Sequence, residues 1–361
     1  MESKAFLALG EEDTRGSKQS TTVGHIPLNN FQLPKPDFVA RKRGEFRGES
    51  ALLGHTAEIR MGQIWDGLSL EIPAFSEAGT LPGMLGTLLR HFFGKAVSGQ
   101  NGTTGQFYHI FYPVEDMFGP SFLGDTALTL NMNIMEGNTL RNYPYVGGRV
   151  KKLTFKQETG QPLLITAECM GQKLDAITAG LSDPTYPAEN LRLDYNDLDI
   201  RTGAVTRTGT APTYTNFSSA GTIIKPESIT IELERGMEDK MRLDGTDTPS
   251  RTQIGVLTGK VTMVLDWEDP ASGFSSVDEF AAWLTAGSSI NIILFWNTGT
   301  QAGSGDNHML VIDLPVCNRL GGVPELSIEK DPMITLEYDL HYSPTTKYAA
   351  GVLLKNTASA L

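Results

Sequence analysis

The sequence contains little of what several common protein classes require. Only two of its 361 residues are cysteines, aromatic residues make up 8% and charged residues 20%. No window approaches the ~20 apolar residues that a membrane-spanning helix needs. The first residues also lack the basic segment and apolar run of a signal peptide. We therefore expect a soluble protein that is made in a cytoplasm and does not contact a membrane.

Sequence motifs for catalysis are absent as well. The chain has no G-x-S-x-G, P-loop, H-E-x-x-H or C-x-x-C motif. Its histidines lack metal-ligand spacing: we expect His91 partly exposed on a helix, and His109 and His308 at strands, on the sheet surface or packed. Paired carboxylates could build a glycosidase site on a β scaffold, but the aromatic residues are not clustered for sugar stacking. We expect no enzyme activity, no catalytic residue, no cofactor and no metal.

The two cysteines, Cys169 and Cys317, lie on strand-like segments far apart in the sequence. Two readings are open: they are buried free thiols, or they form a disulfide within or between subunits.

The net charge is −12, from 30 Lys and Arg against 42 Asp and Glu. A protein that grips nucleic acid irrespective of sequence is normally basic, because it must neutralise phosphates. A free-standing DNA-binding function is therefore not expected.

Among the features that are present, residues 254–296 carry the clearest pattern. Apolar and polar residues alternate over 257–267, which predicts a half-buried strand. Ser276 as N-cap and Glu279 three residues later form a capping box, which predicts a helix, and residues 290–296 return as a strand. The helix has one apolar stripe, which consists of Val277, Phe280, Ala281 and Leu284.

The same pattern occurs once earlier in the chain. Residues 64–72 indicate a strand, TLPGMLGTLLRHFFG at 80–94 indicates a helix that Thr80 can cap, and FYHIFYP at 107–113 indicates the next strand. One strand–helix–strand unit in each half indicates an internal repeat. We predict a mainly β protein with two related domains, each flanked by one short α-helix.

At about 150 residues per domain, the length allows two domains with additional arms. The predicted parts are an extended N-terminal arm (1–50), domain one (51–180), a linker that partly adds to a sheet (181–222), domain two (223–345) and a C-terminal tail (346–361). Within the arm, the basic cluster RKRGEFRG at 41–48 is either a solvated loop or a segment that docks on an acidic patch of a neighbouring copy.

The polar face of the predicted strands is acidic. In residues 127–134 we expect the apolar side chains to point inward and Thr129, Asn131 and Asn133 to point outward. Over all strands the outward acidic positions are Glu168, Glu232, Glu234, Asp266, Glu337 and Asp339, and the outward basic positions are Lys152, Lys156 and Lys260. This face is either an ordinary solvated surface or a functional one.

Residues 236–255 (GMEDKMRLDGTDTPSRTQIG) separate two strong strands of domain two. The segment is charged and nearly free of apolar residues, and loops of this length inside a compact domain are usually functional or disordered. We predict a long hairpin arm that reaches another subunit. Its candidate contact residues are Glu238, Asp239, Lys240, Arg242, Asp244 and Arg251.

Several segments follow one another in a recognisable order. They are ALGEEDTRG (8–16), the LPGMLGTLLRHFFG helix, YHIFYP, YVGGRVKKL (145–153), PLLITAECMG (162–171), PESITIELER, LTGKVTMVLDW and HMLVIDLP. In this order they resemble the tail tube proteins (major tail proteins) of long-tailed bacteriophages, of the two-domain type. The resemblance covers most of residues 45–345.

The resemblance implies a β-barrel or sandwich with one helix per domain, in identical subunits that close rings, and rings that stack into a hollow tube in the virion. Three chains would give a pseudo-sixfold ring, and six chains are the alternative. The family also implies a tape measure protein and tail tip or terminator proteins as partners, and DNA that passes without specific binding.

An acidic bore would let DNA slide, because duplex DNA carries one negative charge per about 1.7 Å of axis. The candidate lumen residues are Glu232, Glu234, Glu337 and Asp339.

The alternative function is a non-enzymatic β-sandwich binding module of a phage or bacterium, carbohydrate-binding or adhesin-like. Such a module would need an exposed aromatic platform or a calcium site. The stretch DYNDLD at 194–199 could suggest calcium, but it lacks the glycine and the distal glutamate of an EF-hand loop, which favours a turn. A tube protein polymerises, whereas a binding module stays a small oligomer.

Overall fold

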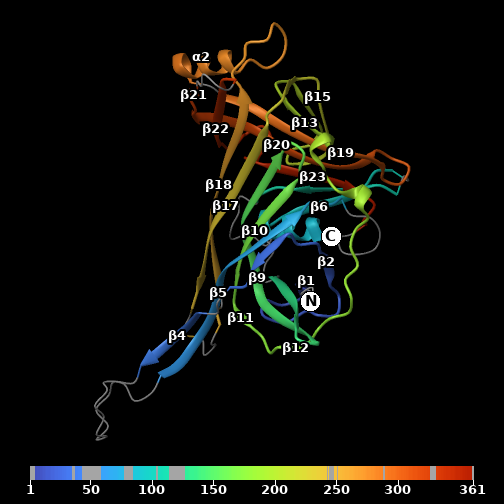
Figure 1. Ribbon diagram of the computed structural model, residues 1–361, viewed down its shortest axis with the longest axis vertical. Helices are drawn as coiled ribbons and strands as arrows, with labels where there is room; N and C mark the ends of the chain where they lie inside the picture. Colours follow the sequence, from blue (N-terminus) through green and yellow to red (C-terminus); the bar gives the residue numbers. More distant parts are fainter. Residues whose placement is uncertain are drawn as a thin grey trace, which may run out of the picture.

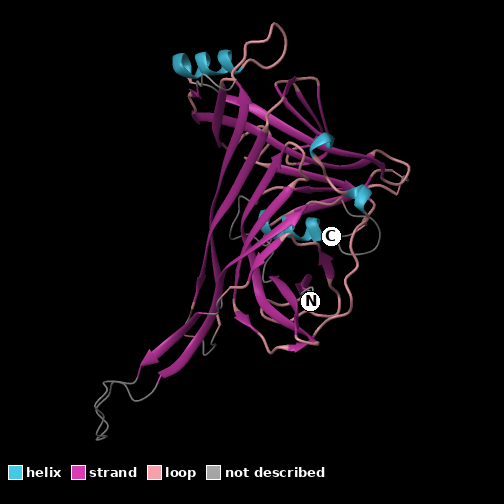
Figure 2. Cartoon of the chain, viewed as in Figure 1, coloured by secondary structure: helices cyan, strands magenta, loops and turns pink. Residues whose placement is uncertain are grey.

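The structure is a computed structural model that describes residues 5–34, 37–42, 58–76, 84–102, 105–113, 127–241, 243, 248–249, 251–287, 289–325 and 331–359. Its fold is mainly β, as predicted from the alternating patterns (Figure 2). Nearly all strands of the described chain belong to one hydrogen-bonded sheet system, and a single two-stranded hairpin stands apart from it.

In the first half, the described residues form one α-helix and twelve strands. They are β1 (Ala5–Glu12), β2 (Gly24–Ile26), β3 (Asn30–Gln32), β4 (Asp37–Lys42), β5 (Glu58–Pro73), α1 (Met84–Phe93), β6 (Ala96–Gln100), β7 (Phe107–Phe111), β8 (Ala127–Glu136), β9 (Thr139–Glu158), β10 (Leu164–Gly171), β11 (Lys173–Leu174) and β12 (Thr178–Ala179).

The second half begins with two 3-10 turns, η1 (Glu189–Leu191) and η2 (Tyr195–Asp197). The further elements are β13 (Leu198–Thr202), β14 (Val205–Thr210), β15 (Thr213–Ser219), β16 (Thr222–Ile224), β17 (Ser228–Lys240), β18 (Arg251–Asp266), α2 (Ser276–Ala286), β19 (Ser289–Gln301), β20 (Asn307–Gly321), β21 (Pro324–Glu325), β22 (Met333–Leu340) and β23 (Gly351–Asn356). The β4–β5 hairpin projects from one end of the molecule, and α2 lies at the opposite end (Figure 1).

The strand pairing shows an internal repeat. Neighbouring strands of the first half follow the order β2–β1–β8–β9–β10–β5, with β3 and β4 on the far side of β5. Those of the second half follow the order β16–β13–β19–β20–β22–β18–β17. Counterparts occur in the same order along the chain, and α1 follows β5 as α2 follows β18. Both halves therefore have one topology, in which β8 corresponds to β19. The predicted match of residues 107–113 with 290–296 was wrong, because β7 pairs with β6 and β23 outside this order.

The two halves form one continuous sheet. β17 pairs with β9 from Ser228 opposite Glu158 to Glu234 opposite Lys152. Buried side chains of both halves also belong to one hydrophobic cluster. The β9–β17 pairing is therefore the seam at which the two copies of the topology meet.

Residues 5–34 correct the prediction of a free N-terminal arm. β1 pairs with β8 along its whole length. The predicted outward residues of β8 are buried. The N-terminal segment satisfies the polar groups of two of them, and Asn133 accepts from the Leu181 N–H at 2.8 Å. Thr129 Oγ1 donates to Glu12 Oε1 at 2.7 Å, and Asn131 Nδ2 donates to the Gln19 carbonyl at 2.9 Å. Polar side chains in alternation therefore marked a buried hydrogen-bonded layer here, not a solvated face.

The predicted linker and tail also contain ordered strands. Within 181–222, β13 adds to β19, as expected of a segment that partly joins a sheet, and β14 pairs with β15 as a separate hairpin. Within 346–361, β23 is buried and pairs with both β20 and β7. It is not a free tail. The domain boundaries given above stay a prediction.

Both predicted helices are present, with one correction at a cap. Thr80 lies outside the described residues; α1 itself has nine of its ten residues buried. α2 is capped by Ser275, whose side chain accepts from the Asp278 N–H at 2.9 Å, and not by Ser276. The Ser276 hydroxyl instead donates to the Asp266 carbonyl at 2.8 Å, which holds the helix start to the end of β18.

The two cysteines are free and buried. Within the subunit they form no disulfide, and the burial of both side chains favours free thiols over a bond between subunits. Burial raises the pKa of Cys169 to about 12, and it raises the pKa of Cys317 as well.

Candidate functional site: the acidic face of the sheet

A continuous sheet across both halves carries one polar face. Its strands run in the order β5–β10–β9–β17–β18–β22. Because successive side chains of a strand alternate between faces, the residues opposite one another in the pairing all lie on the same side. The four predicted lumen residues lie on this face, with β18 between their two strands: Glu232 and Glu234 on β17, and Glu337 and Asp339 on β22.

Lys260 of β18 lies among the acidic residues of this face. It lies opposite Glu232 on one side and Asp339 on the other. Its Nζ is 3.0 Å from Glu337 Oε2, and Lys152 Nζ on β9 is 3.5 Å from Glu232 Oε2. These side chains are 25–48% exposed, so water screens the pairs and each adds little stability. The ion pairs fix the positions of the charged side chains but contribute little to the free energy of unfolding.

Acidic residues outnumber basic ones on this face more strongly than the sequence count indicated. The pairing adds Glu71, which shares a row with Thr166, and Glu158, which lies opposite Ser228. In the paired rows the acidic residues are then Glu71, Glu158, Glu168, Glu232, Glu234, Asp266, Glu337 and Asp339, against Lys152, Lys156 and Lys260. At the bulges of β5 and β9, Asp66 and Lys151 add one ion pair at 2.6 Å. Glu71 and Glu158 were missed although extending the period-two alternation to the ends of their strands would have found both.

The opposite side of the same strands is a packed core. Ile229, Ile231 and Leu233 of β17 and Val261 and Met263 of β18 are at most 2% exposed. A sheet that is apolar on one side and charged on the other has its register fixed, because a slip by one residue would bury the charges. The acidic residues therefore occupy defined positions on a rigid surface.

The predicted arm is a β-hairpin whose base is anchored to its own subunit. β17 and β18 stay paired out to Lys240 opposite Arg251. Asp239 forms a buried ion pair with Arg15 at 2.8 Å and accepts a hydrogen bond from Thr252 at 2.6 Å. Of the other candidate arm residues, Glu238 pairs with Lys240 at 2.5 Å. Arg242, Asp244 and the side chain of Arg251 lie outside what the structure describes. Asp239 thus belongs to the subunit interior and not to a free arm.

A comparison with known protein families identifies the family to which this chain belongs. Residues 2–341 match the family model described as phage tail tube protein, which is nearly the whole chain. This chain belongs to the phage tail tube protein family. A search of curated proteins found no match. The family assignment makes the tail tube chain a structural protein of the virion tail that assembles with itself into a tube, and it favours this function over the binding module.

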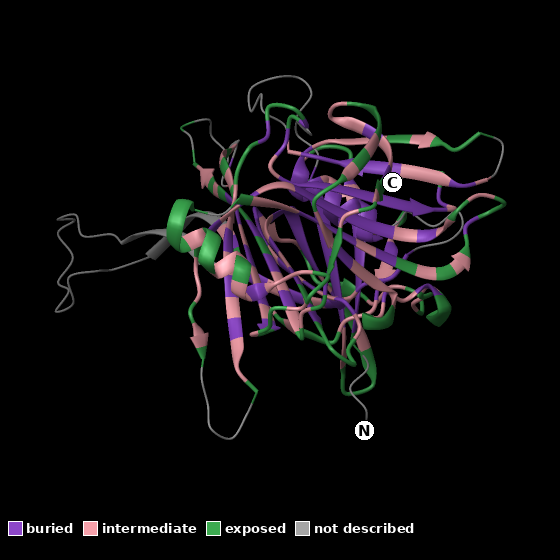
Figure 3. Ribbon diagram, turned by 90° about the horizontal axis from the view of Figure 1, so that it is seen from above, coloured by how far each residue is buried: buried purple, intermediate pink, exposed green. Residues whose placement is uncertain are grey.

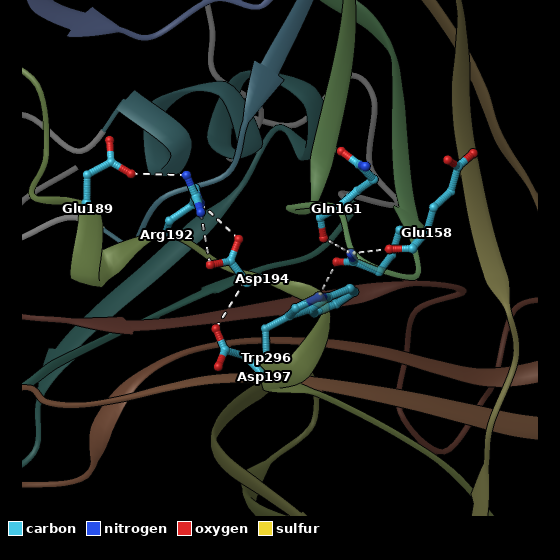
Figure 4. Close-up of polar contacts among 8 residues, drawn as sticks. Glu158, Gln161, Glu189, Arg192, Asp194, Asp197 and Trp296 are labelled. Carbon is cyan, nitrogen blue, oxygen red and sulfur yellow. Dashed lines mark hydrogen bonds and ion pairs between the residues drawn. The ribbon is translucent and has the colours of Figure 1, made fainter.

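The acidic stretch at 194–199 forms the predicted turn in this tail tube chain. It contains η2, in which the Asp194 N–H donates to Asp197 Oδ2 at 3.1 Å. Arg192 neutralises the turn, because its Nε donates to Asp194 Oδ1 at 2.8 Å (Figure 4). Among the residues that the structure describes, no group of His, Cys, Asp and Glu could hold a metal ion.

Three histidines of the tail tube chain, His91, His109 and His308, are packed inside it. His91, predicted to be partly exposed, is 2% exposed, and its Nε2 lies 3.3 Å from Glu11 Oε1. His109 and His308 are also buried. Burial lowers the pKa of all three. In the described part of the chain, no helix is long and apolar enough to cross a membrane.

Proposed function

We propose that this chain forms rings that stack into the hollow tail tube and that the acidic face lines the bore through which duplex DNA leaves the virion. One observation carries the proposal: a single sheet spans both halves, with a packed core on one side and, in its paired rows, eight acidic against three basic residues on the other. A smooth, continuous sheet with one charged face is suited to line a channel.

The negative charge of the acidic face suits a channel through which DNA passes. DNA carries one negative charge per about 1.7 Å of axis, so a basic lining would bind the genome and slow its exit. Glu232, Glu234, Glu337 and Asp339 would repel the phosphates and keep a water layer between DNA and wall. The DNA then passes without specific binding.

The internal repeat favours three chains per ring over six. Each chain supplies two copies of one topology, joined head to tail by the β9–β17 seam. Closed rings require this kind of heterologous contact. Three chains would thus place six copies around the bore.

Assembly would involve further tail components. Family membership suggests a tape measure protein within the lumen during assembly and tip or terminator proteins at the tube ends. The subunit would be made in the cytoplasm of the bacterial host before it enters the tail.

A charge-reversal experiment tests the role of the acidic face. Glu232, Glu234, Glu337 and Asp339 are changed together to Lys, and tube length is measured by negative-stain electron microscopy. We expect tubes of normal length, because the four side chains are partly or fully exposed, together with DNA ejection that is at least about tenfold slower.

The matched control changes four exposed acidic residues outside this face to Lys: Asp13, Glu189, Glu268 and Asp269. We expect tubes and ejection at the normal rate. Normal ejection by the acidic-face variant would refute the lumen assignment, and small particles at every concentration of the unmodified protein would count against the tube itself.

A further inference from the structure

β17 and β9 pair at the seam between the two halves. Their counterparts in the repeat, β3 near the start of the chain and β21 near its end, each lack a neighbouring strand on one edge in the described chain. We infer that β3 of one chain adds to β21 of a second copy, in the register that β17 uses on β9. This inference rests on the ring assembly proposed above and names the strands that close the ring. The occupant is a second copy of this chain, because the chain already contains one example of the same contact.

The equivalence of the strands follows from their partners. β10 and β22 have eight residues each and share Ile-Thr-x-Glu, at 165–168 and 334–337. Glu168 lies between Ser69 and Lys152, and Glu337 lies between Thr262 and Gly321. The end of β20 and β21 therefore correspond to the second half of β9.

The same comparison fixes the register. Gln32 pairs with Ser69 as Thr230 pairs with Thr262, so Gln32 corresponds to Thr230. Glu325 pairs with Met333, the first residue of β22, as Lys156 pairs with Leu164, the first residue of β10. Glu325 therefore corresponds to Lys156.

Within the chain, Thr230 lies directly opposite Lys156. Between two chains, Gln32 should thus lie opposite Glu325. Both side chains are exposed, as expected of positions on the polar face. The neighbouring positions Leu33 and Pro324 correspond to Ile231 and Phe155, which pack on the core side.

Both strands present an open edge in the described part of the chain. β3 pairs with β5, and β21 pairs with β22, and neither has a second partner strand there. Open edges are templates for pairing with another chain. A head-to-tail contact between these two edges would leave neither edge open once the ring closes.

An exposed apolar patch surrounds the β21 edge. Leu320 and Val323 are 54% and 65% exposed, and Leu284 of α2 is 63% exposed. They belong to one region, because the Arg319 guanidinium lies 4.9 Å from the ring centre of Trp283 and ties the end of β20 to α2. Exposed apolar residues that gather in this way mark protein contact sites.

The contrast between the two helices supports the same conclusion. α1 has nine of ten residues buried, whereas α2, its counterpart in the repeat, has one of eleven buried (Figure 3). α1 packs against β2, β7 and β9 of its own half, whereas most of α2 is exposed in the described chain. The exposure of α2 is explained if the second copy of the chain covers it.

A disulfide between Gln32→Cys and Glu325→Cys tests the contact. Assembled double-variant tubes are oxidised with copper phenanthroline and run on a non-reducing denaturing gel. The native cysteines can stay, because both are buried. We expect more than half of the chains to be linked. Since each chain links once at each end, the ladder should stop at a closed trimer if three chains form a ring.

Two controls make the result specific. Gln32→Cys with Pro324→Cys shifts one cysteine to the opposite face of the strand and should link at least about fivefold less. Each single variant alone should give no ladder, and a mixture of the two single variants should give dimers only.

The outcomes separate this inference from the proposed function. Tubes in the electron microscope without the Gln32–Glu325 link would overturn the seam and leave the tube function standing. Stronger linking by the Pro324 variant would overturn the register. A linked ladder from particles that never form tubes would support the seam and count against the tube function.

Discussion

Arg15 and Asp239, 224 positions apart in the sequence, form a buried ion pair in which Arg15 Nη2 donates to Asp239 Oδ1 at 2.8 Å. Their side chains are 6% and 3% exposed. The pair connects the loop after β1 to the base of the β17–β18 hairpin. It therefore divides the predicted arm into an anchored base and a tip that begins beyond Lys240.

Removing one partner of this pair should destabilise the subunit. Asp239→Ala leaves the Arg15 charge buried without its partner, and such losses typically cost about 3–5 kcal/mol. Urea unfolding followed by circular dichroism measures the change. Glu238→Ala is the matched control: its side chain is 68% exposed, so we expect a change within about 0.5 kcal/mol. Equal effects of the two variants would contradict the anchoring role.

The hairpin tip should serve contacts between rings and not the fold. Residues 241–247 are replaced by Asn-Gly, a dipeptide that closes tight hairpins, which keeps Asp239, the last strand pair and Pro249 in place; the Pro249 carbonyl accepts from Gln172 Nε2 at 2.6 Å. We expect folded subunits with a melting temperature within a few degrees of normal that form rings but no long tubes. Tubes of normal length in the electron microscope would refute the role of the tip.

Gln157 connects the two halves through its side chain. Its Nε2 donates to the carbonyls of Gln161 and Glu158 at 2.6 and 3.2 Å, and its Oε1 accepts from Trp296 Nε1 at 3.1 Å. Figure 4 labels these three partners. Gln157→Leu should cost about 1–3 kcal/mol, because it leaves the buried indole N–H unsatisfied.

The double variant with Trp296→Phe distinguishes this cause from a simple loss of packing. Since the phenylalanine has no N–H to leave unsatisfied, the two changes should cost less together than the sum of their separate effects. Strict additivity in chemical denaturation would show that the Trp296–Gln157 bond contributes nothing.

The subunit should lose stability in mild acid. Burial lowers the pKa of His91, His109 and His308, so the folded chain keeps these imidazoles neutral. The unfolded chain binds protons near pH 6.5, so it holds more protons than the folded chain just below that pH. The free energy of unfolding should therefore be fully present above about pH 7 and fall as the pH decreases toward 5.

Removing one buried histidine should reduce this dependence. His308 Nδ1 shares one hydrogen bond with Ser76 Oγ at 3.0 Å, and the tautomer decides which of the two donates. Burial alone lowers the pKa of His308. His308→Gln keeps a hydrogen-bonding group but does not titrate. We expect a smaller loss of stability between pH 7 and pH 5 in this variant, even if its stability at pH 7 is lower. An unchanged slope would exclude His308 as a source of the acid sensitivity.

Local sequence patterns predicted an element correctly where one periodicity of apolar residues dominated the segment. The alternation over 257–267 predicted β18, since one side of that strand faces the core and the other carries charge. The apolar stripes predicted both helices. The cap of α2 was placed one residue late, because two adjacent serines can both cap a helix and only the backbone path decides between them.

Other predictions failed because local pattern does not reveal what covers a surface. Thr129 and Asn131 alternate with apolar residues in the way of a solvated face, yet β1 and the segment after it cover them. The stretch at 351–356 showed no period of two, since both faces of β23 are buried: Val352 and Leu354 pack in the main core and Leu353 packs in a second hydrophobic cluster. In both cases the covering residues come from the far end of the chain or the other half.

By itself, the sequence determined the β class, the strand and helix of β5–α1 and of β18–α2, and the acidic character of one polar face, because each depends on residues that are close in the chain. Only the tertiary structure decided that both halves have one topology, that β9 and β17 join them, and that Asp239 is buried. These depend on which strands pair, and pairing between distant strands follows from the summed burial of a whole core and not from any one segment. The unpaired edges of β3 and β21 became visible for the same reason: an edge is open only with respect to all the other strands.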